Sequence, residues 1–379
     1  MRIVIAPNAF KGSLTALQAA EAIQQGILGI MPHADCILLP IADGGDGTAD
    51  VLVRGTDGQM HTTAVMDALG DVIQASFGIL GDGTTAVIEM ANASGLRLVP
   101  SERRNPLVTT TYGTGELMRA ALNRSARRMI LGLGGSATVD GGAGMAQALG
   151  ARLFDRHGQE IIWGGGALDM LDRIEISGLD PRLQTCEIIA ACDVDNPLVG
   201  DQGAARIFGP QKGATPQMVA QLDANLTHYA HIIQRDLGIT VRDIAGAGAA
   251  GGLAAGLIAF CGARLQPGID LVLDTLDIDQ HLQTADLVIT GEGRIDGQTA
   301  HGKAPVGVAL RAKRHGIPVV ALTGGIGDEA DQLYAYGIDA IIPIVARPMA
   351  LEDAMKEAAP LLQEAAARML RVMTLKFRR

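Results

Sequence analysis

The chain has 379 residues, of which 48% are apolar and only 3% aromatic, and it contains 49 glycines. This length suffices for two domains with aliphatic cores. The formal net charge is −10, and there is neither a basic face nor a set of stacking aromatics, so we expect no nucleic-acid partner. An anionic substrate would need cations placed locally at its site.

Cysteine usage indicates a reducing compartment. The four cysteines are scattered and form no Cys-x-x-Cys pair, which is typical of free thiols in the cytosol. A strand starts directly after Met1, so we expect no signal peptide and a cytoplasmic protein. The sequence sets no oligomeric state, and a homodimer is one option.

The first strand and its loop form the first candidate site. Residues 2–7 are a β-branched run that predicts a buried parallel strand. A helix follows from about Thr15, with Ser13 or Thr15 as its N-cap. Lys11 lies at the carboxyl end of this strand, where open α/β sheets bind ligands.

A second predicted strand runs into the turn DGGDGT, in which Asp43 and Asp46 bracket two glycines. Paired carboxylates on a Gly-rich turn suit Mg²⁺, which takes one or two protein carboxylates and keeps the rest of its shell for water and phosphate. A solvated Asp-Gly turn is the alternative. Residues 61–103 have a different pattern: short segments in which apolar and polar residues alternate, separated by turns, which is typical of antiparallel hairpins.

The stretch Leu131–Gly142, LGLGGSATVDGG, is the most distinctive part of the chain. It follows an apolar run and precedes helical spacing over roughly residues 138–149. Free backbone N–H groups at a helix start, aided by the helix dipole, form a seat for phosphate. Ser136 and Thr138 can add hydrogen bonds, and Asp140 can hold a metal ion. We interpret the stretch as a phosphate-handling loop, with a tight turn that merely needs small residues as the alternative.

The same stretch also satisfies the looser dinucleotide fingerprint, as Gly132-x-Gly134-x-x-Ala137 with Asp155 at the expected distance. An NAD(P)-dependent reductase of a small hydroxy acid is therefore a competing interpretation. Asp140 argues against it, because a carboxylate at the helix start repels a pyrophosphate unless Mg²⁺ lies between them. ATP brings Mg²⁺, whereas a nicotinamide cofactor does not.

A further polar cluster follows the next predicted strand. Asp193, Asp195 and Asn196 lie at its end, and the segment GPQKG then places Lys212 between glycines. Lys212 is a candidate phosphate clamp, and a surface lysine in a turn is the alternative.

Residues 244–263 carry no charge over a length that could span a membrane, and they contain Gly248, Gly252 and Gly256 at fourfold spacing. The segment consists mostly of Gly and Ala, whose hydropathy is weak, and it lacks aromatic anchors. We therefore expect a buried helix lying against a sheet, and no membrane partner.

The last third of the chain alternates apolar strands with helices, which predicts a parallel sheet with right-handed crossovers. Residues 1–60 share this style, so we expect 1–60 and 285–379 to form one discontinuous α/β domain. Residues 61–284 would form a second α/β domain, inserted into the first and carrying the Gly-rich loop. The fold class is thus α/β, with largely parallel sheets in two domains.

The segment Gly297–Ala304, GQTAHGKA, resembles a P-loop but has Ala304 where Mg²⁺ binding needs Ser or Thr. It also lies several residues after its strand, so we do not expect a P-loop NTPase. Lys303 still qualifies as a phosphate contact from a different geometry.

Strand ends along the chain together carry what phosphoryl transfer requires: backbone amides, carboxylates for Mg²⁺, cations for the developing charge and one base. No Ser-His-Asp or Cys-His arrangement is indicated. The strand-end residues are Lys11, Asp43, Asp46, Asp140, Asp193, Asn196, Lys212, Glu292, Asp296 and Lys303.

At these residues the chain resembles the bacterial type I glycerate kinases, the glycerate 2-kinase family, across essentially its whole length. The motifs that carry the resemblance are APNAFKGSL, PIADGGDGT, IEMANASGL, TTTYGTGEL, GLGGSATVDGGAGMAQALGA, ACDVDNPLVG, GPQKGA, GAGAAGG and LVITGEGRIDGQTAHGKAPVGVA. The resemblance implies transfer of the ATP γ-phosphoryl group to D-glycerate with Mg²⁺, giving 2-phosphoglycerate, in glucarate, galactarate and glyoxylate degradation. It also implies two α/β domains, one inserted in the other.

Residue chemistry at these positions suggests individual roles. Lys11 and Ser13 would orient the glycerate carboxylate or a phosphate, and Asn196 would contact the substrate. Asp43, Asp193 and Asp296 compete for the role of base, with Asp193 slightly favoured. For the nucleotide, we expect the phosphates to be held by Gly134, Gly135, Ser136 and Thr138, and we expect Glu292 and Lys303 to contribute to the same site. The candidates for binding Mg²⁺ are Asp140, Asp193 and Asp46. Lys212 and Lys303 would neutralise the charge of the transferred group.

The sequence departs from the family in its first motif, which usually reads A-P-D-S-F-K but here has Asn8 and Ala9. We interpret this change as tuning of the substrate pocket. Besides the reductase, two other interpretations stay open: a kinase for another small hydroxy acid, and a non-catalytic sensor of nucleotides or sugar acids.

Overall fold

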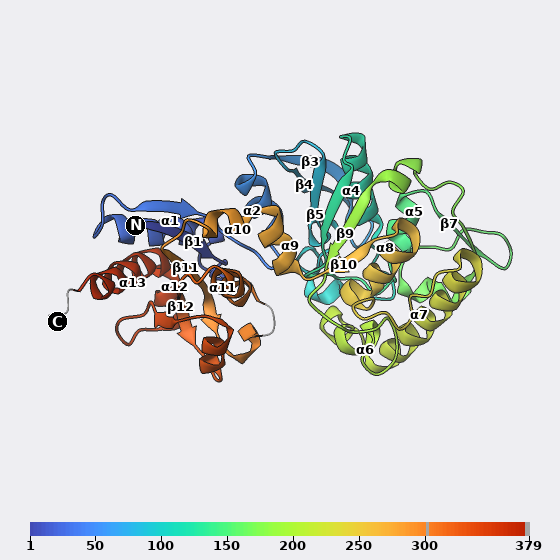
Figure 1. The fold of residues 1–379 in the computed structure, drawn as a ribbon. Helices are drawn as coiled ribbons and strands as arrows, with labels where there is room; N and C mark the ends of the chain where they lie inside the picture. The colour runs from blue at the N-terminus through green and yellow to red at the C-terminus, as the bar shows by residue number, and fades with distance from the viewer. Residues whose placement is uncertain (301–302, 376–379) are drawn as a thin grey trace. The chain divides into compact units, whose positions relative to one another are not determined.

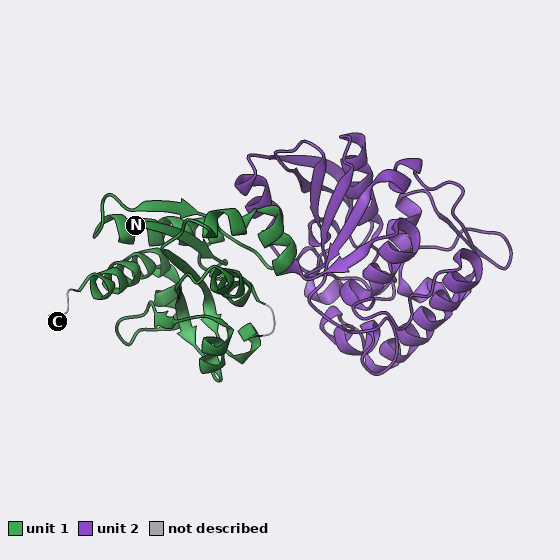
Figure 2. Ribbon diagram, viewed as in Figure 1, with its two compact units in different colours: residues 1–43, 269–379 green, residues 44–268 purple. Residues whose placement is uncertain are grey.

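The chain folds into two units, here described from a computed structural model of residues 1–300 and 303–375. Unit 1 combines residues 1–43 with 269–379, and unit 2 comprises residues 44–268 (Figure 2). Both units are of the α/β type with largely parallel sheets, as the sequence predicts.

Unit 1 contains a five-stranded parallel sheet in the order β13-β12-β11-β1-β2 (Figure 1). From β1 the chain moves outward to β2 on one side, whereas β11, β12 and β13 extend on the other side. The strand order therefore reverses between β1 and β11, and at such a point the loops at the carboxyl ends diverge and leave a crevice. The strands are β1 (Arg2–Pro7), β2 (Asp35–Leu38), β11 (Leu287–Ile295), β12 (Val319–Ile326) and β13 (Ala340–Pro343).

Helices cover both faces of this sheet. Ile3 and Ile5 of β1 pack in one core with α1 and α13, while the intervening Val4 is buried against the other face. Alternate residues of a strand point to opposite faces, which explains the continuous apolar run. As expected, Thr15 caps α1: its Oγ1 accepts from the Gln18 amide at 3.2 Å, completing a capping box. The helices are α1 (Ala16–Leu28), α9 (Gly268–Thr275), α10 (Ile278–Leu282), α11 (Ala304–Arg314), α12 (Leu351–Lys356) and α13 (Ala358–Met373).

The boundaries between the units differ from the expected positions near residues 60 and 284. At the first boundary, α2 (Thr48–Gly55) packs against β4 and β5 and thus belongs to unit 2. At the second, α9 and α10 belong to unit 1, where Arg311 of α11 forms ion pairs with Asp274 and Asp279, both at 2.6 Å. Helix packing therefore sets the boundaries between the units. The change in the pattern of apolar residues along the sequence does not coincide with them.

Unit 2 is built on a six-stranded mixed sheet in the order β10-β9-β6-β5-β4-β3. β3 with β4 and β4 with β5 pair antiparallel, which confirms the hairpins predicted from residue 61 as far as β5, and the remaining pairs are parallel. The predicted pattern does not extend to residues 91–103, which contain a short helix and two 3₁₀ turns. The strands are β3 (Gln59–Met66), β4 (Val72–Ile79), β5 (Thr85–Glu89), β6 (Arg128–Gly132), β9 (Glu187–Ala191) and β10 (Arg264–Gln266).

The uncharged segment 244–263 forms a short 3₁₀ turn and then α8 (Leu253–Cys261), which is buried against α5 (Ala143–Ala148). At Gly256 an added Cβ would lie 2.6 Å from the Gly141 carbonyl oxygen, so the small residue permits this close approach. Among the described residues, no helix combines the length and apolar character needed to cross a membrane. The other helices of unit 2 are α3 (Ala91–Ser94), α4 (Tyr112–Asn123), α5 (Ala143–Ala148), α6 (Ala204–Phe208) and α7 (Pro216–Leu237).

The dinucleotide-binding interpretation of the Gly-rich stretch is wrong. A Rossmann unit needs the strand that ends in Asp155 to lie parallel beside the strand before the glycines. Instead β7 (Arg152–Asp155) pairs antiparallel with β8 (Leu171–Glu175) in a separate two-stranded sheet.

Candidate active site

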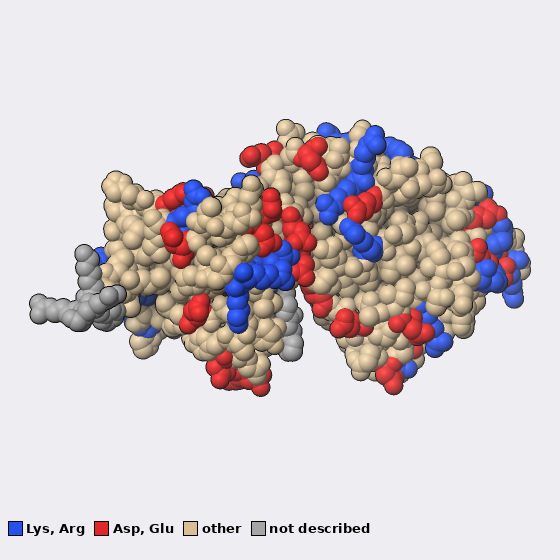
Figure 3. Space-filling view, in the orientation of Figure 1, with Lys and Arg blue, Asp and Glu red and all other residues tan. Residues whose placement is uncertain are grey.

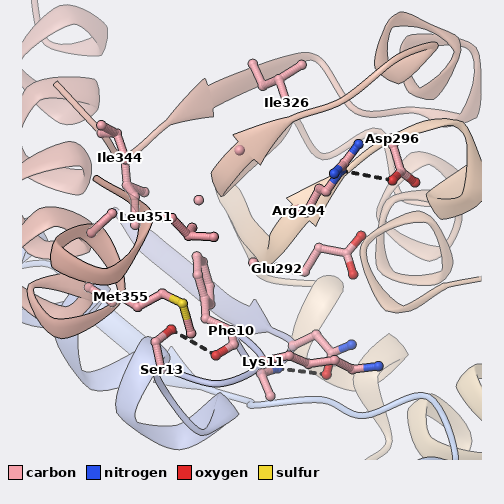
Figure 4. A pocket seen from close by; sticks show the side chains of 18 of the residues that line it. Phe10, Lys11, Ser13, Glu292, Arg294, Asp296, Ile326, Ile344, Leu351 and Met355 are labelled. Atoms are coloured by element: carbon pink, nitrogen blue, oxygen red, sulfur yellow. Dashed lines mark hydrogen bonds and ion pairs between the residues drawn. The ribbon is translucent and has the colours of Figure 1, made fainter. Parts of the chain in front are cut away.

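A cavity of about 640 Å³ lies in unit 1 at the carboxyl ends of β1, β11 and β12, where the strand order reverses (Figure 4). One side of it is charged and carries Lys11, Glu292, Arg294 and Asp296, whereas the opposite side is apolar. This combination of a charged and an apolar wall in one cavity marks it as the candidate active site.

The loop after β1 supplies Asn8 and Lys11. The Asn8 amide donates to the Gly291 carbonyl at 2.8 Å, which ties the loop to β11. Its side chain accepts from the Ala9 amide at 2.7 Å and donates to Asp43 Oδ2 at 3.5 Å. The residue that replaces the family's usual acid therefore lies against Asp43, an aspartate already among the candidate bases.

Ser13 lines the same cavity, but its hydroxyl is engaged within the loop. Its Oγ donates to the Phe10 carbonyl at 2.9 Å, and the Phe10 amide donates to the Leu14 carbonyl at 2.9 Å. Gly12 allows this tight turn with a φ of +81°, which other residues rarely adopt. The closed turn leaves Lys11 exposed at its tip.

β11 supplies Glu292, whose carboxylate is buried. Thr299, in a 3₁₀ turn at Gly297–Ala300, donates its hydroxyl to Glu292 Oε1 at 2.7 Å. Burial raises the pKa of Glu292, and the nearby Asp43 and Asp296 carboxylates raise it further. The Thr299 hydrogen bond and the Lys303 charge lower it. Three carboxylates, those of Asp43, Glu292 and Asp296, therefore lie near one another in the cavity.

Asp296 follows β11 directly and is fixed by two neighbours. Its Oδ2 lies 3.3 Å from Arg294 Nε, and its Oδ1 accepts from the Gln298 amide at 3.0 Å. Arg294 is a site residue that the sequence analysis missed. Its place two residues after Glu292 on the same strand is the signal that could have identified it, because alternate residues of a strand share a face.

The apolar wall was also missed from sequence. It contains Phe10 from the β1 loop, Ile344 after β13, and Leu351 and Met355 from α12. Figure 4 shows these side chains on the opposite side of the cavity from Glu292 and Arg294. Their segments are distant in the sequence, so no local motif joins them.

The structure thus brings together six of the residues singled out from sequence and places the others in unit 2. Residues 301–302 of the P-loop-like segment lie outside the described part of the chain, although Lys303 is described. The six residues around the cavity are Lys11, Ser13, Asp43, Glu292, Asp296 and Lys303.

In unit 2, the Gly-rich stretch differs from the expected strand-loop-helix. α5 begins at Ala143 rather than near Thr138, after Gly141 and Gly142 with φ of +64° and +78°. The helix is short, and its first amides have partners: Gly142 and Gly144 donate to Asp140 and Met145 donates to Thr111 Oγ1. The start of this helix is therefore not the open phosphate seat that the spacing predicted.

Asp140 is completely buried beneath this stretch. Its carboxylate accepts from the Thr111 amide and hydroxyl, both at 2.8 Å, and from the Gly142 and Gly144 amides. Burial raises its pKa, and these hydrogen bonds oppose the rise. With both oxygens engaged and 0% exposure, Asp140 organises the loop and α4, so we do not retain it as a metal ligand.

Lys212 is also buried, not a surface lysine. Its Nζ donates to Ser136 Oγ and to the Thr138 carbonyl, both at 2.7 Å. Burial lowers its pKa to about 7, against the attraction of Asp140. Ser136 and Thr138 are buried as well, whereas Gly134 and Gly135 are exposed. Lys212 thus stabilises the conformation of the Gly-rich stretch through buried hydrogen bonds.

The remaining candidate site residues of unit 2 lie on two loops: Asp46 precedes α2, and Asp193 and Asn196 follow β9. Asp46 forms an ion pair with Arg97 at 3.4 Å. Asp193, at the end of β9, accepts from the Gly268 amide at 2.8 Å, and Asn196 donates to the Gln202 carbonyl at 2.8 Å. On the face shown in Figure 3, described basic and acidic side chains are interspersed.

The whole chain is similar to known kinases. Residues 3–374 match the model of the glycerate kinase family. A glycerate kinase of Bacillus subtilis (strain 168) is 54% identical over 366 residues, covering 97% of this chain and 96% of the relative. A glycerate 2-kinase of Escherichia coli (strain K12) is 52% identical and covers 94% of each chain. A crystal structure from Salmonella typhimurium LT2, provisionally named glycerate kinase 2, superposes with a TM-score of 0.91 at 51% identity over 98% of both chains.

Proposed function

Because the chain belongs to the glycerate kinase family, we propose that it transfers the γ-phosphoryl group of ATP to the 2-hydroxyl of D-glycerate, giving 2-phosphoglycerate. One observation supports this most directly: lysines and carboxylates from separate strand ends converge on a single cavity in unit 1. Phosphoryl transfer depends mainly on such positioning and charge stabilisation.

The residues of the cavity can divide the reaction between them. The hydroxyl oxygen of glycerate forms a bond to the γ-phosphorus, the bond from that phosphorus to the bridging oxygen breaks, and ADP leaves. Lys11 and Lys303 offset the charge on the transferred group. We assign the base to Asp43, which takes the hydroxyl proton, since both oxygens of Asp296 are engaged by Arg294 and Gln298. Asp193, favoured from sequence, is the alternative base.

The same carboxylates fit a magnesium ion. The pKa of Glu292 is raised partly by the neighbouring carboxylates, so a cation bound there would relieve their repulsion. The described residues contain no group of three acidic, histidine or cysteine side chains arranged as a cage. Mg²⁺ commonly uses one or two carboxylates and the substrate phosphates, and Glu292, of which only Oε1 has a hydrogen-bond partner among the described residues, would hold it here together with the phosphates. When bound, it neutralises charge on the phosphates.

Two features of cellular context follow as proposals. All four cysteines are free thiols, which is compatible with work in the reducing cytosol. The substrate is a small hydroxy acid, so the enzyme would act in organic-acid degradation of the kind that produces glycerate.

The test is ³¹P NMR of the purified protein with ATP, Mg²⁺ and D-glycerate. We expect a new phosphomonoester signal that matches 2-phosphoglycerate. A signal that matches 3-phosphoglycerate would support kinase activity but contradict the proposal that the 2-hydroxyl is phosphorylated. Unchanged ATP with D-glycerate, together with turnover of another hydroxy acid, would overturn the proposed substrate.

A further inference from the structure

We infer that the cavity of unit 1 binds the nucleotide, with the base against its apolar wall and the phosphates toward its lysines. This inference rests on the proposed function, because it identifies which of the two substrates the cavity accepts. It also replaces the expectation from sequence that Gly134, Gly135, Ser136 and Thr138 hold the ATP phosphates.

Size favours the larger substrate. D-glycerate has three carbons, and each bears oxygen, so it can use neither a volume of about 640 Å³ nor an apolar wall. Cavities of about 300–1,000 Å³ that combine apolar walls with a few polar groups suit ligands larger than glycerate. A nucleotide has an apolar planar base at one end and phosphates at the other.

The apolar rim supports the same assignment. Leu351 is 75% exposed and Ile326 is 52% exposed, and both line the cavity together with the buried Phe10 and Ile344. Exposed large apolar side chains that gather around a cavity indicate that a ligand covers them. A purine ring is flat and apolar on both faces, and it matches this wall.

The opposite end of the cavity matches the phosphates. Lys11 and Lys303 line it, and so does Arg294, which forms an ion pair with Asp296. Figure 4 shows Lys11, Glu292 and Arg294 together on the side away from Leu351. The charged and apolar ends therefore occur in the order in which a nucleotide would need them.

Gly325, near the end of β12, lines the cavity and leaves open space there. An added Cβ at Gly325 would meet no atom within 4 Å, and the backbone there is outside the left-handed region. A larger side chain at this position would project into open space without backbone strain.

The Gly-rich stretch of unit 2 has fewer groups that are free to bind a phosphate. Thr138 is completely buried, Ser136 Oγ accepts from Lys212, and the first amides of α5 are occupied by Asp140 and Thr111. A phosphate at these groups would have to displace their internal partners, which leaves the exposed Gly134 and Gly135 as the accessible part of the stretch.

The experiment is a fluorescence titration with mant-ADP, alongside the Michaelis constants for ATP and D-glycerate. We expect Leu351→Asp and Gly325→Leu each to weaken mant-ADP binding at least about tenfold. They should raise KM for ATP and leave KM for D-glycerate nearly unchanged. The matched control is Leu310→Asp, at a residue that is 43% exposed on α11 and outside the cavity lining, and it should bind mant-ADP normally. Leu351 is on the surface, so its variant tests the idea even if Gly325→Leu does not fold.

Two results would overturn the inference. One is normal mant-ADP binding by Leu351→Asp with a raised KM for D-glycerate, which would assign the cavity to the hydroxy acid. The other is weakened mant-ADP binding only in a Ser136→Ala variant, which would return the nucleotide to unit 2. Failure of the proposed function would look different. The wild type would bind mant-ADP and the Leu351→Asp variant would bind it weakly, yet the wild type would form no 2-phosphoglycerate.

Discussion

Lys212 Nζ lies 2.7 Å from Ser136 Oγ, although the two residues are 76 positions apart in the chain. A second hydrogen bond, to the Thr138 carbonyl, completes the contact. The Lys212 amine donates both bonds. Together with Asp140, this contact makes the Gly-rich stretch a rigid, internally bonded part of unit 2.

Replacing Lys212 with Met should destabilise the protein in a pH-dependent way. The pKa of Lys212 falls from 10.5 to about 7 on folding, so the unfolded chain binds more protons between these values. The contribution of Lys212 to the free energy of unfolding therefore rises with pH across this range. We expect Lys212→Met to cost about 1–3 kcal/mol near pH 9 and less at pH 7, as measured by urea unfolding. The exposed Lys313→Met is the control, and an equal loss at both pH values would show that the amine stays charged.

Asp140→Asn separates a structural role from a metal-binding role. The amide keeps one acceptor oxygen but presents an NH₂ group to amides that donate, so buried donors lose their partner. We expect a loss of about 2–4 kcal/mol in urea unfolding. Asp46→Asn, at an exposed aspartate, should change the stability by less than about 0.5 kcal/mol. A fully stable Asp140→Asn protein that needs more Mg²⁺ would restore Asp140 as a metal ligand.

Glu292→Gln should increase stability while lowering activity. The pKa of Glu292 is raised in the folded state, so the carboxyl stabilises the fold at low pH, and this contribution is lost as pH rises through the raised pKa. The neutral Gln avoids that loss. We expect the variant to unfold at higher urea than the wild type at pH 7, with no advantage below the unfolded pKa of 4.5, and to have a reduced kcat. The exposed Glu352→Gln should show neither effect, and an equal advantage at low pH would refute the explanation.

The base can be identified by replacing Asp43, Asp193 and Asp296 with Asn one at a time. We expect Asp43→Asn to lower kcat by about 10²–10⁴-fold with little change in KM, because loss of a positioned base affects the chemical step. Steady-state kinetics with D-glycerate measure both quantities. A comparable loss confined to Asp193→Asn would assign the role to the residue favoured from sequence.

The sequence by itself determined the family, the α/β class, the buried strands and the cap of α1, because strand periodicity, capping and motif order are local properties. It also placed Lys11, Asp43, Glu292, Asp296 and Lys303 at strand ends. The order of the strands then brings these residues to one cavity, since β1 and β11 are neighbours although most of the chain separates them.

Only the tertiary structure decided which polar residues are available to a ligand. Asp140 and Lys212 are residue types that phosphate sites commonly contain. Packing buries both side chains, however, and their hydrogen bonds are made within unit 2. The apolar wall likewise depends on which face α12 presents to the cavity. Burial depends on contacts between distant segments, and these contacts separate residues that build the fold from residues that face a substrate.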